Sequence, residues 1–283
     1  MTILVLGRTG QVARELAVLK GIECIGRDAA DLKDPEACAA LICSKRPEAV
    51  INAAAYTAVD QAEEEEAHAT TINGAAPGAM ARACANLGVP FVQISSDYVF
   101  KGSGTAPWQP DDPTAPLGAY GRSKLAGEQA VRAADGTYAI LRTSWVVSAH
   151  GSNFVKTMLS LGAERDILNI VSDQIGGPTG AAEIAAACHV IARQLIDDPN
   201  KSGTYHFSGT PDVSWADFAR EIFAQSKLNC TVMDIPSSEY STQTQRPLNS
   251  RLDCRATQTV FGIPRSDWRE TLTDILKDLG ARS

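Results

Sequence analysis

Short runs of apolar residues recur along the first half of the chain, each bounded by glycine, proline or polar residues. Runs that are apolar throughout, and not alternating, are typical of strands covered on both faces in a parallel sheet. The runs that predict strands are residues 3–6, 22–25, 49–51, 91–94 and 138–141.

Segments with the helical spacing of apolar positions lie between these predicted strands. Asp34 followed by Pro35 marks one helix start, because proline is favoured at the first helical position. The predicted helices are residues 11–20, 35–45, 59–86 and 119–134. Strands and helices that alternate in this way predict an α/β protein with a doubly wound parallel sheet of the Rossmann type. A ligand crevice is then expected at the carboxyl ends of the strands.

The regular alternation loosens after Trp145. The pattern there predicts helices at residues 152–163, 181–195, 215–225 and 267–279, strands at 167–171 and 204–207, and a polar loop at 236–249. We therefore expect a cofactor-binding domain over residues 1–145. Residues 146–283 should mainly form a smaller α/β substrate domain, with part of 167–195 returning to the larger sheet.

Composition narrows the class of protein. The chain has 283 residues, 44% hydrophobic and 21% charged, with a net charge of −7. This is enough to bury a large core, and the acidic balance argues against broad binding of nucleic acid or anionic membranes. No apolar run reaches the roughly 18 residues of a membrane span. Seven scattered cysteines without a Cys-x-x-Cys pair indicate a reducing, cytoplasmic location. The acidic run at residues 63–66 is expected to be a solvated helix face.

A glycine-containing turn joins the first predicted strand to the first predicted helix. Gly7 and Gly10 would allow a tight turn and a close approach of the backbone to a pyrophosphate. The N–H groups at the helix start would bind its charge. Ala13 replaces the third glycine of the usual fingerprint and still permits close packing. The turn predicts dinucleotide binding; the alternative is an ordinary tight βα turn.

The choice of cofactor depends on the end of the second predicted strand. A carboxylate there would bond the ribose 2′-hydroxyl, whereas an arginine accommodates a 2′-phosphate. This chain has Arg27 and Asp28 at that point, with Arg8 in the glycine turn. Two guanidinium groups favour NADPH, while Asp28 leaves NADH open. The alternative is that Arg27 is only a surface charge.

A tyrosine and a lysine stand four residues apart on one predicted helix face, at Tyr120 and Lys124. Ser96 ends the fourth strand region. These three side chains would form a carbonyl-reductase site, in which the phenol gives a proton to the substrate oxygen as hydride arrives. The lysine ammonium is expected to lower the pKa of the phenol. The serine hydroxyl is expected to hold the substrate oxygen.

Longer stretches carry a family resemblance. They are residues 52–60, 95–100, 120–128, 141–146, 153–158, 173–179 and 246–250. Together they resemble the dTDP-4-dehydrorhamnose reductase family of the extended short-chain dehydrogenase/reductase superfamily, from residue 1 to about residue 275. Ser96 stands where that family usually has threonine, and the hydroxyl is retained.

The resemblance implies a role for each matching residue. For the cofactor it implies Gln11 and Val12 beside Gly10 at the pyrophosphate, Arg27 at the ribose, Asp31 and Leu32 at the adenine, Ala55, Tyr56 and Thr57 along the cofactor, and Tyr120 and Lys124 at the nicotinamide ribose. For the reaction it implies Ser96, Tyr120 and Lys124 as catalytic residues, Ser96, Asp97 and Trp145 at the sugar, and Arg246 and Asn249 at the nucleotide. From the residues alone, Trp145 is equally a core aromatic and Arg246 a surface charge.

The implied activity is the NADPH-dependent reduction of the C4 ketone of dTDP-4-dehydro-β-L-rhamnose to dTDP-L-rhamnose. The alternatives are another nucleotide-sugar 4-ketoreductase or epimerase of the same fold, or a non-catalytic NADP-binding regulatory subunit. Some relatives form homodimers that hold Mg²⁺ at interface carboxylates, which Glu15, Glu183 and Asp278 would match. Exposed carboxylates usually act only as solubilising charges, so no metal site is assigned.

Overall fold

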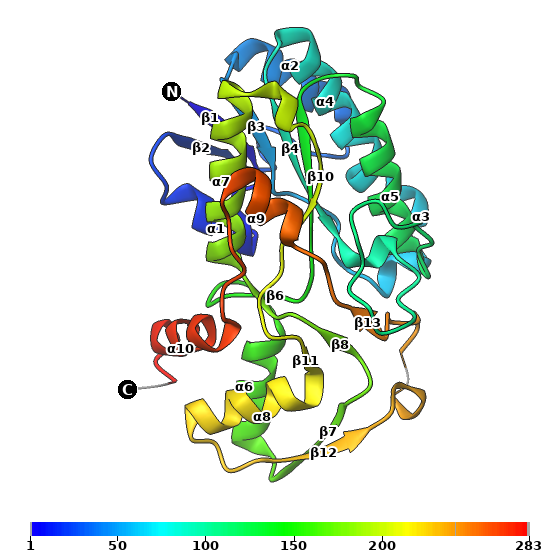
Figure 1. The fold of residues 1–283 in the computed structure, drawn as a ribbon, viewed down its shortest axis with the longest axis vertical. Coiled ribbons are helices and arrows are strands. Elements are labelled where there is room, and N and C mark those ends of the chain that lie inside the picture. The colour runs from blue at the N-terminus through cyan, green and yellow to red at the C-terminus, as the bar shows by residue number, and fades with distance from the viewer. Residues whose placement is uncertain (1, 241, 282–283) are drawn as a thin grey trace.

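A parallel sheet of six strands forms the centre of the computed structural model, which describes residues 2–240 and 242–281. The strand order is β10-β5-β4-β3-β1-β2, and every neighbouring pair is parallel (Figure 1). The strands are β1 (Ile3–Leu6), β2 (Ile22–Ile25), β3 (Ala49–Asn52), β4 (Phe91–Ser96), β5 (Tyr138–Thr143) and β10 (Gly203–His206). The predicted doubly wound sheet is confirmed. The winding reverses between β1 and β3, and such switch points hold ligands in related sheets.

Helices cover both faces of this sheet (Figure 1). One face packs against α1 (Gln11–Ala17), α7 (Ala181–Asp197) and α9 (Arg255–Phe261). The other packs against α2 (Pro35–Lys45), α4 (Ala76–Leu87) and α5 (Ala119–Arg132). Ile3 and Val5 of β1 belong to the first core, whereas Leu4 and Leu6 belong to the second. Both faces are buried, which is why these strands are apolar throughout.

The prediction of one continuous helix over residues 59–86 is wrong. The segment contains a 3₁₀ turn (Gln61–Glu63), α3 (Glu66–Thr70), a π-helical turn (Thr71–Ala75) and α4. Pro77 explains the π-helical turn, because it lacks an N–H and its ring would clash with the carbonyl of Asn73 in a regular α-helix. That carbonyl lies against α5, where a Cβ on Gly127 would come within 2.0 Å of its oxygen. The lack of a Cβ on Gly127 therefore lets α5 approach the π-helical turn closely.

A separate hydrophobic core lies beyond the sheet, at the lower end of Figure 1. It is built by α6 (Phe154–Glu164), α8 (Trp215–Ser226), α10 (Trp268–Asp278), β7 (Ile167–Val171) and β12 (Thr231–Ile235). Asn153, Ser214 and Asp267 cap the three helices through their side chains. The division into domains at residue 145 stays a prediction, while α7 lies on the large sheet as part of the first core.

Short paired segments connect the two cores. They are β6 (Val146–Val147) with β9 (Thr179–Gly180), and β8 (Ile175–Gly176) between β11 (Val213–Ser214) and β13 (Asn249–Ser250). The predicted loop 236–249 holds a 3₁₀ turn at Ser237–Glu239 and includes residue 241, which lies outside the described residues. Within residues 2–240 and 242–281, no helix has the length and apolar character needed to cross a membrane.

Candidate active site

The carboxyl end of β4 faces the first turns of α5. Lys124 Nζ donates a hydrogen bond to the carbonyl of Ile94 at 2.7 Å. The Tyr120 phenol shares a hydrogen bond with the hydroxyl of Ser96. The structure thus brings together Ser96, Tyr120 and Lys124, the three residues predicted to be catalytic.

Asp97 follows Ser96 and is almost completely buried, with 3% of its surface exposed. Its Oδ1 accepts a hydrogen bond from Ser96 Oγ at 3.0 Å, and Tyr98 N donates to the same hydroxyl at 3.2 Å. Asp97 Oδ2 has no hydrogen-bond partner among the described residues. Burial raises the pKa of this carboxyl to about 6, although interactions with the hydroxyls of Ser250 and Ser96 oppose the shift. A buried oxygen without a donor is costly, and a ligand hydroxyl would satisfy it.

The electrostatics at Tyr120 differ from the prediction. Burial raises the pKa of the phenol, the charge of Asp97 raises it further, and the hydrogen bond with Ser96 only partly opposes this. The expected lowering by Lys124 is therefore wrong for the free protein. Burial lowers the pKa of Lys124 to about 8, with the carboxylate of Glu128 opposing the shift. At neutral pH Tyr120 consequently carries its proton, which is the form needed for an acid.

The acidic run at residues 63–66 is solvated, as predicted, with Glu63 and Glu64 exposed, and it also holds the start of α5. Glu63 Oε1 accepts a hydrogen bond from Ala119 N at 2.7 Å. Glu66 binds the guanidinium of Arg122 through both oxygens, at 2.6 and 2.8 Å. The partners lie 56 residues apart along the chain, so the sequence carried no local signal for these contacts.

Gly7 and Gly10 form the turn between β1 and α1. Gly7 has a φ of +125°, and a Cβ there would lie 3.2 Å from the backbone of Ala53, so the position requires glycine. Gly10 precedes α1 without a side-chain cap, and the first turn of α1 has no acidic residue. The amide oxygen of Gln11 accepts hydrogen bonds from Ser148 Oγ and Asn153 Nδ2, both at 2.9 Å. The start of α1 is thereby tied to the segment before α6.

The end of β2 carries the groups expected near the adenosine. Arg8 Nη2 lies 3.3 Å from Asp28 Oδ1, and both side chains are more than half exposed. Arg27 beside them is exposed. Asp31 accepts a hydrogen bond from the backbone of Lys33 at 3.0 Å. Leu32 is buried in the core that includes α2 and α4, and Val12 in the core that includes α7. Arg8 thus pairs with Asp28, whereas Arg27 forms no ion pair with another described residue.

The residues predicted to line the cofactor after β3 form a fixed loop. Tyr56 N donates to Asn73 Oδ1 at 2.8 Å, and Asn73 Nδ2 donates to Tyr56 O at 3.0 Å. Ala55 and Thr57 are exposed on either side of Tyr56. The buried amide of Asn73 therefore holds a loop whose flanking side chains remain open to a ligand.

Trp145 has an unusual backbone conformation, with a φ of +49°. Bulky residues rarely adopt this region, and such strain is retained mostly at functional sites. Its ring stacks on Trp215 with centroids 3.5 Å apart and planes 10° apart. Because Trp145 follows β5 and Trp215 begins α8, this stack joins the sheet to the second core.

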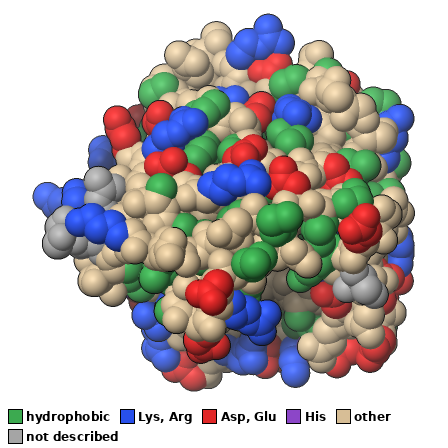
Figure 2. Space-filling view, turned by 90° about the horizontal axis from the view of Figure 1, so that it is seen from below, with side chains coloured by type: hydrophobic (Ala, Val, Ile, Leu, Met, Phe, Trp, Pro, Cys, Tyr) green, Lys and Arg blue, Asp and Glu red, His purple; other side chains and the backbone are tan. Residues whose placement is uncertain are grey.

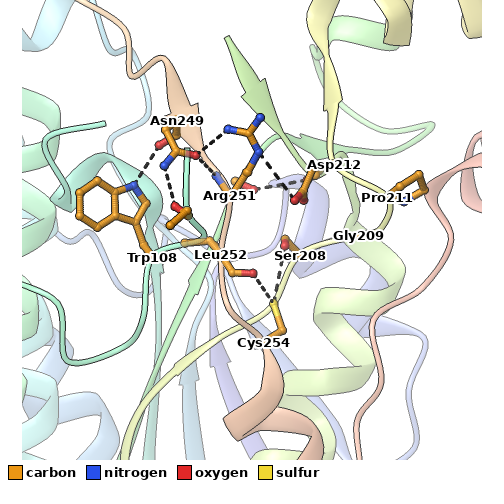
Figure 3. A network of polar contacts seen from close by, with 12 residues as sticks. Trp108, Ser208, Gly209, Pro211, Asp212, Asn249, Arg251, Leu252 and Cys254 are labelled. Atoms are coloured by element: carbon orange, nitrogen blue, oxygen red, sulfur yellow. Dashed lines mark hydrogen bonds and ion pairs between the residues drawn. The ribbon is translucent and has the colours of Figure 1, made fainter. Parts of the chain in front are cut away.

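Arg246 and Asn249 have different surroundings. Arg246 Nη2 lies 2.6 Å from Asp60 Oδ2, and Asp60 also accepts a hydrogen bond from Thr244 N at 3.2 Å. These two contacts hold the loop that contains Arg246 against the segment after β3. Asn249 is buried, and its Nδ2 donates to Ala106 O at 2.8 Å while its Oδ1 accepts from Arg251 Nη1 at 3.1 Å (Figure 3). Its amide is therefore occupied in holding the neighbouring loop, and its predicted contact with the nucleotide stays a prediction.

The three carboxylates considered for Mg²⁺ do not form a site within one chain. Glu15 lies 3.5 Å from His150 Nε2, Glu183 accepts a hydrogen bond from Thr271, and Asp278 is exposed on α10. In the described part of the chain, no group of three His, Cys, Asp or Glu residues is arranged to hold a metal. A metal shared between two chains stays a prediction.

The face seen in Figure 2 mixes acidic and basic side chains.

Comparisons with known proteins agree with this geometry. The family model described as RmlD substrate binding domain matches residues 1–281. A dTDP-4-dehydrorhamnose reductase of Burkholderia thailandensis is 42% identical, covering 99% of both chains. The solved dTDP-4-dehydrorhamnose reductase of Clostridium acetobutylicum has a TM-score of 0.91 and 36% identity, covering 99% of this chain and 100% of its own. That of Bacillus anthracis, solved in complex with NADP, has a TM-score of 0.90 and 33% identity, covering 98% and 100%.

Proposed function

We propose, from the premise that this chain belongs to the RmlD substrate binding domain family, that it is an NADPH-dependent dTDP-4-dehydrorhamnose reductase. It reduces the C4 ketone of dTDP-4-dehydro-β-L-rhamnose to dTDP-L-rhamnose. The observation that carries the proposal is the cluster of Ser96, Asp97, Tyr120 and Lys124 at the carboxyl end of β4. These residues supply a proton donor, a hydrogen-bonding hydroxyl and an unpartnered carboxylate oxygen together.

The turn between β1 and α1 suits the pyrophosphate of the cofactor. Gly7 brings the backbone close to β3, and no carboxylate covers the N–H groups at the start of α1. We assign Gly10, Gln11 and Val12 to the pyrophosphate. Ala55, Tyr56 and Thr57 lie along the cofactor, and Asp31 and Leu32 lie near the adenine. NADPH, when bound, supplies the hydride.

The 2′-phosphate of the cofactor is assigned to Arg27. The guanidinium of Arg8 offsets the charge of Asp28, which would otherwise repel a phosphate at the end of β2. Arg27 is exposed and forms no ion pair with another described residue. Its guanidinium is therefore suited to a bidentate phosphate contact. This supports NADPH as the cofactor, with NADH bound more weakly.

Tyr120 provides the proton. Its pKa is raised by burial, so the phenol is protonated at neutral pH and transfers its proton to the alkoxide oxygen formed at C4. The hydroxyl of Ser96 holds the same oxygen. The Lys124 ammonium orients the nicotinamide ribose and stabilises the phenolate that remains after transfer.

The sugar contacts are assigned to Asp97 and Trp145. Asp97 Oδ2 is buried without a partner and would accept a hydrogen bond from a sugar hydroxyl. Trp145, in its strained conformation at the junction of the two cores, would form one wall of the sugar site. Arg246 is assigned to the diphosphate, for which it must leave or share its contact with Asp60. On this proposal residues 1–145 bind the cofactor and 146–283 mainly select the substrate, in the cytoplasm.

The test is a coupled assay with the purified protein, the 4-keto sugar nucleotide, and either NADPH or NADH. We expect one NADPH oxidised per dTDP-L-rhamnose formed, with slower turnover on NADH. Conversion of the sugar without net cofactor consumption would indicate an epimerase. Cofactor binding without any turnover would indicate a regulatory subunit, and either result would overturn the proposal.

A further inference from the structure

Glu128 continues the face of α5 that carries Tyr120 and Lys124, at intervals of four residues. Its side chain is fully buried, with 0% exposed. Ser95 Oγ donates a hydrogen bond to Oε1 at 2.7 Å. Arg142 of β5 binds both oxygens, from Nε to Oε1 at 2.8 Å and from Nη2 to Oε2 at 2.7 Å. The carboxylate therefore joins α5 to two strands of the sheet.

Arg142 is itself fixed on every side. Only 1% of its surface is exposed, and β4 and β5 place it directly beside Ser95. Its Nη1 donates to the carbonyl of Pro110 at 2.9 Å and lies 3.3 Å from His206 Nε2. Its guanidinium carbon lies 4.9 Å from the ring centroid of Phe100. The partner of Glu128 thus cannot shift without disturbing the core of the sheet.

Three consecutive residues of β4 contact three successive turns of α5. Ser96 bonds Tyr120, the carbonyl of Ile94 bonds Lys124, and Ser95 bonds Glu128. An α-helix that slid or rolled on the strand would break all three contacts together. The buried ion pair fixes the far end of this contact and so sets where the two catalytic side chains lie.

Stability alone does not explain a buried ion pair, because apolar side chains of similar size often stabilise a core as well or better. An apolar pair, however, would leave Lys124 buried without a counter-charge. Only 4% of the surface of Lys124 is exposed, and its ammonium bonds a neutral carbonyl. The carboxylate of Glu128, one turn away, contributes a negative charge that acts on Lys124, although it is itself paired with Arg142.

We propose that Glu128, held by Arg142, is a positioning residue for the catalytic pair: it fixes α5 against β4 and supplies the buried negative charge that keeps Lys124 cationic. This inference rests on the proposed reductase function, in which Lys124 must be protonated. It adds Glu128 and Arg142 to the groups on which turnover depends, although neither is expected to touch the substrate.

The charges around Glu128 define the direction in which the pKa of Lys124 should change when Glu128 is replaced. Arg142 reaches it from β5 and Arg132 from α5 itself, the latter at 2.9 Å, while His206 of β10 has its pKa lowered to about 3 by burial and is neutral. Burial lowers the pKa of Lys124 to about 8, and Glu128 is the charge that opposes this. Loss of that charge lowers the pKa of Lys124 further. Activity that needs the ammonium is lost as pH rises through this pKa, so the loss should begin at lower pH.

The experiment is the pH profile of kcat for Glu128→Gln, which keeps the size of the side chain and removes its charge. We expect the alkaline loss of activity to move down by about one pH unit. The maximal kcat should fall on the order of 10-fold through misplacement of α5. Glu23→Gln is the matched control, because Glu23 forms an exposed ion pair with Lys45 and its loss should leave the profile unchanged.

The double variant Glu128→Gln/Arg142→Met separates positioning from stability. Removing both charges should restore Tm relative to the single variant, yet the alkaline loss should stay at lower pH because Glu128 is the charge that acts on Lys124. If the single variant does not fold, the double variant gives the same readout. An alkaline limb at the wild-type pH in either folded variant overturns the inference. An inactive wild-type enzyme would instead overturn the proposed function.

Discussion

The two ends of the candidate site are built in opposite ways. At the catalytic end, Lys124, Glu128 and Arg142 are each exposed by 4% or less and are held by buried hydrogen bonds. At the recognition end, the side chain of Arg8 is 58% exposed, Arg27 is exposed, and Arg246 has one ion pair with Asp60. The contrast indicates that the chemistry is fixed before ligands arrive, whereas Arg8 and Arg27 stay hydrated until then and Arg246 is half-buried in its ion pair.

The same difference in burial determines how much free energy a substitution costs at each end of the site. An exposed ion pair contributes about 0–1 kcal/mol to stability, while breaking one partner of a buried pair costs about 3–5 kcal/mol. Substitutions at the catalytic end should therefore lower kcat or stability. Substitutions at the recognition end should change KM and leave the fold intact.

The largest expected effect is that of Tyr120→Phe. Loss of the proton donor should lower kcat by about 10²–10⁴-fold, with the Kd for NADPH nearly unchanged because the ring remains. Steady-state turnover and cofactor fluorescence titration measure the two quantities. Turnover close to that of the wild type would remove the assigned role of Tyr120.

Arg142→Ala should have the next largest effect, on stability. It leaves the carboxylate of Glu128 buried without its main partner and should reduce the free energy of unfolding by about 3–5 kcal/mol, measured by denaturant titration. Arg255→Ala is the matched control, because the Arg255 side chain is 83% exposed in its pair with Asp253. Its denaturation midpoint should stay close to that of the wild type, because solvent screens an exposed pair. Equal losses of unfolding free energy in the two variants would contradict the proposed difference between the buried and the exposed ion pairs.

The sequence predicted the large sheet well for a physical reason. Residues of β1 alternate between two buried cores, so the strand is apolar at every position and bounded by polar residues, which is a strong local signal. The two-residue strands β8 and β13 carry no such signal, because their pairing depends on long-range contacts. The π-helical turn at residues 71–75 is flanked by alanine-rich segments that favour an α-helix on both sides, so the local pattern does not reveal it, and only Pro77 marks its position.

The sequence predicts the features of the candidate site that lie within one helix or strand. It does not predict the features that depend on contacts between elements. Tyr120 and Lys124 are four residues apart on a helix, so their common face followed from the sequence. The raised pKa of Tyr120 depends on burial and on Asp97 of another element, and its direction was predicted wrongly. The partners of Glu63 and Glu66 lie in α5, which a run of acidic residues does not reveal.

Arg246→Met tests the recognition end at the substrate. If the guanidinium binds the diphosphate, its loss should raise KM for the sugar nucleotide by about 10- to 100-fold, with kcat changed only a few-fold. Arg220→Met removes a similar side chain from exposed ion pairs with Asp217 and Asp234 in the second core and should leave KM unchanged. A fall in kcat at unchanged KM for Arg246→Met would contradict the assignment.

Arg27→Ala should have the smallest effect and is selective between cofactors. The exposed guanidinium is assigned to the 2′-phosphate, so its loss should raise KM for NADPH about 10-fold and barely change KM for NADH. Parallel titrations with the two cofactors measure the ratio. Equal changes for both would show that Arg27 does not contact the group that distinguishes them.

Isotope transfer tests the central claim most directly. The wild-type enzyme is supplied with NADPH deuterated at the reactive C4 position and with the 4-keto sugar nucleotide, and the product is analysed by mass spectrometry and NMR. Hydride delivery to the ketone predicts one deuterium at C4 of dTDP-L-rhamnose for each NADPH oxidised. A product without deuterium at C4, or a converted sugar with the cofactor left unchanged, would contradict the account.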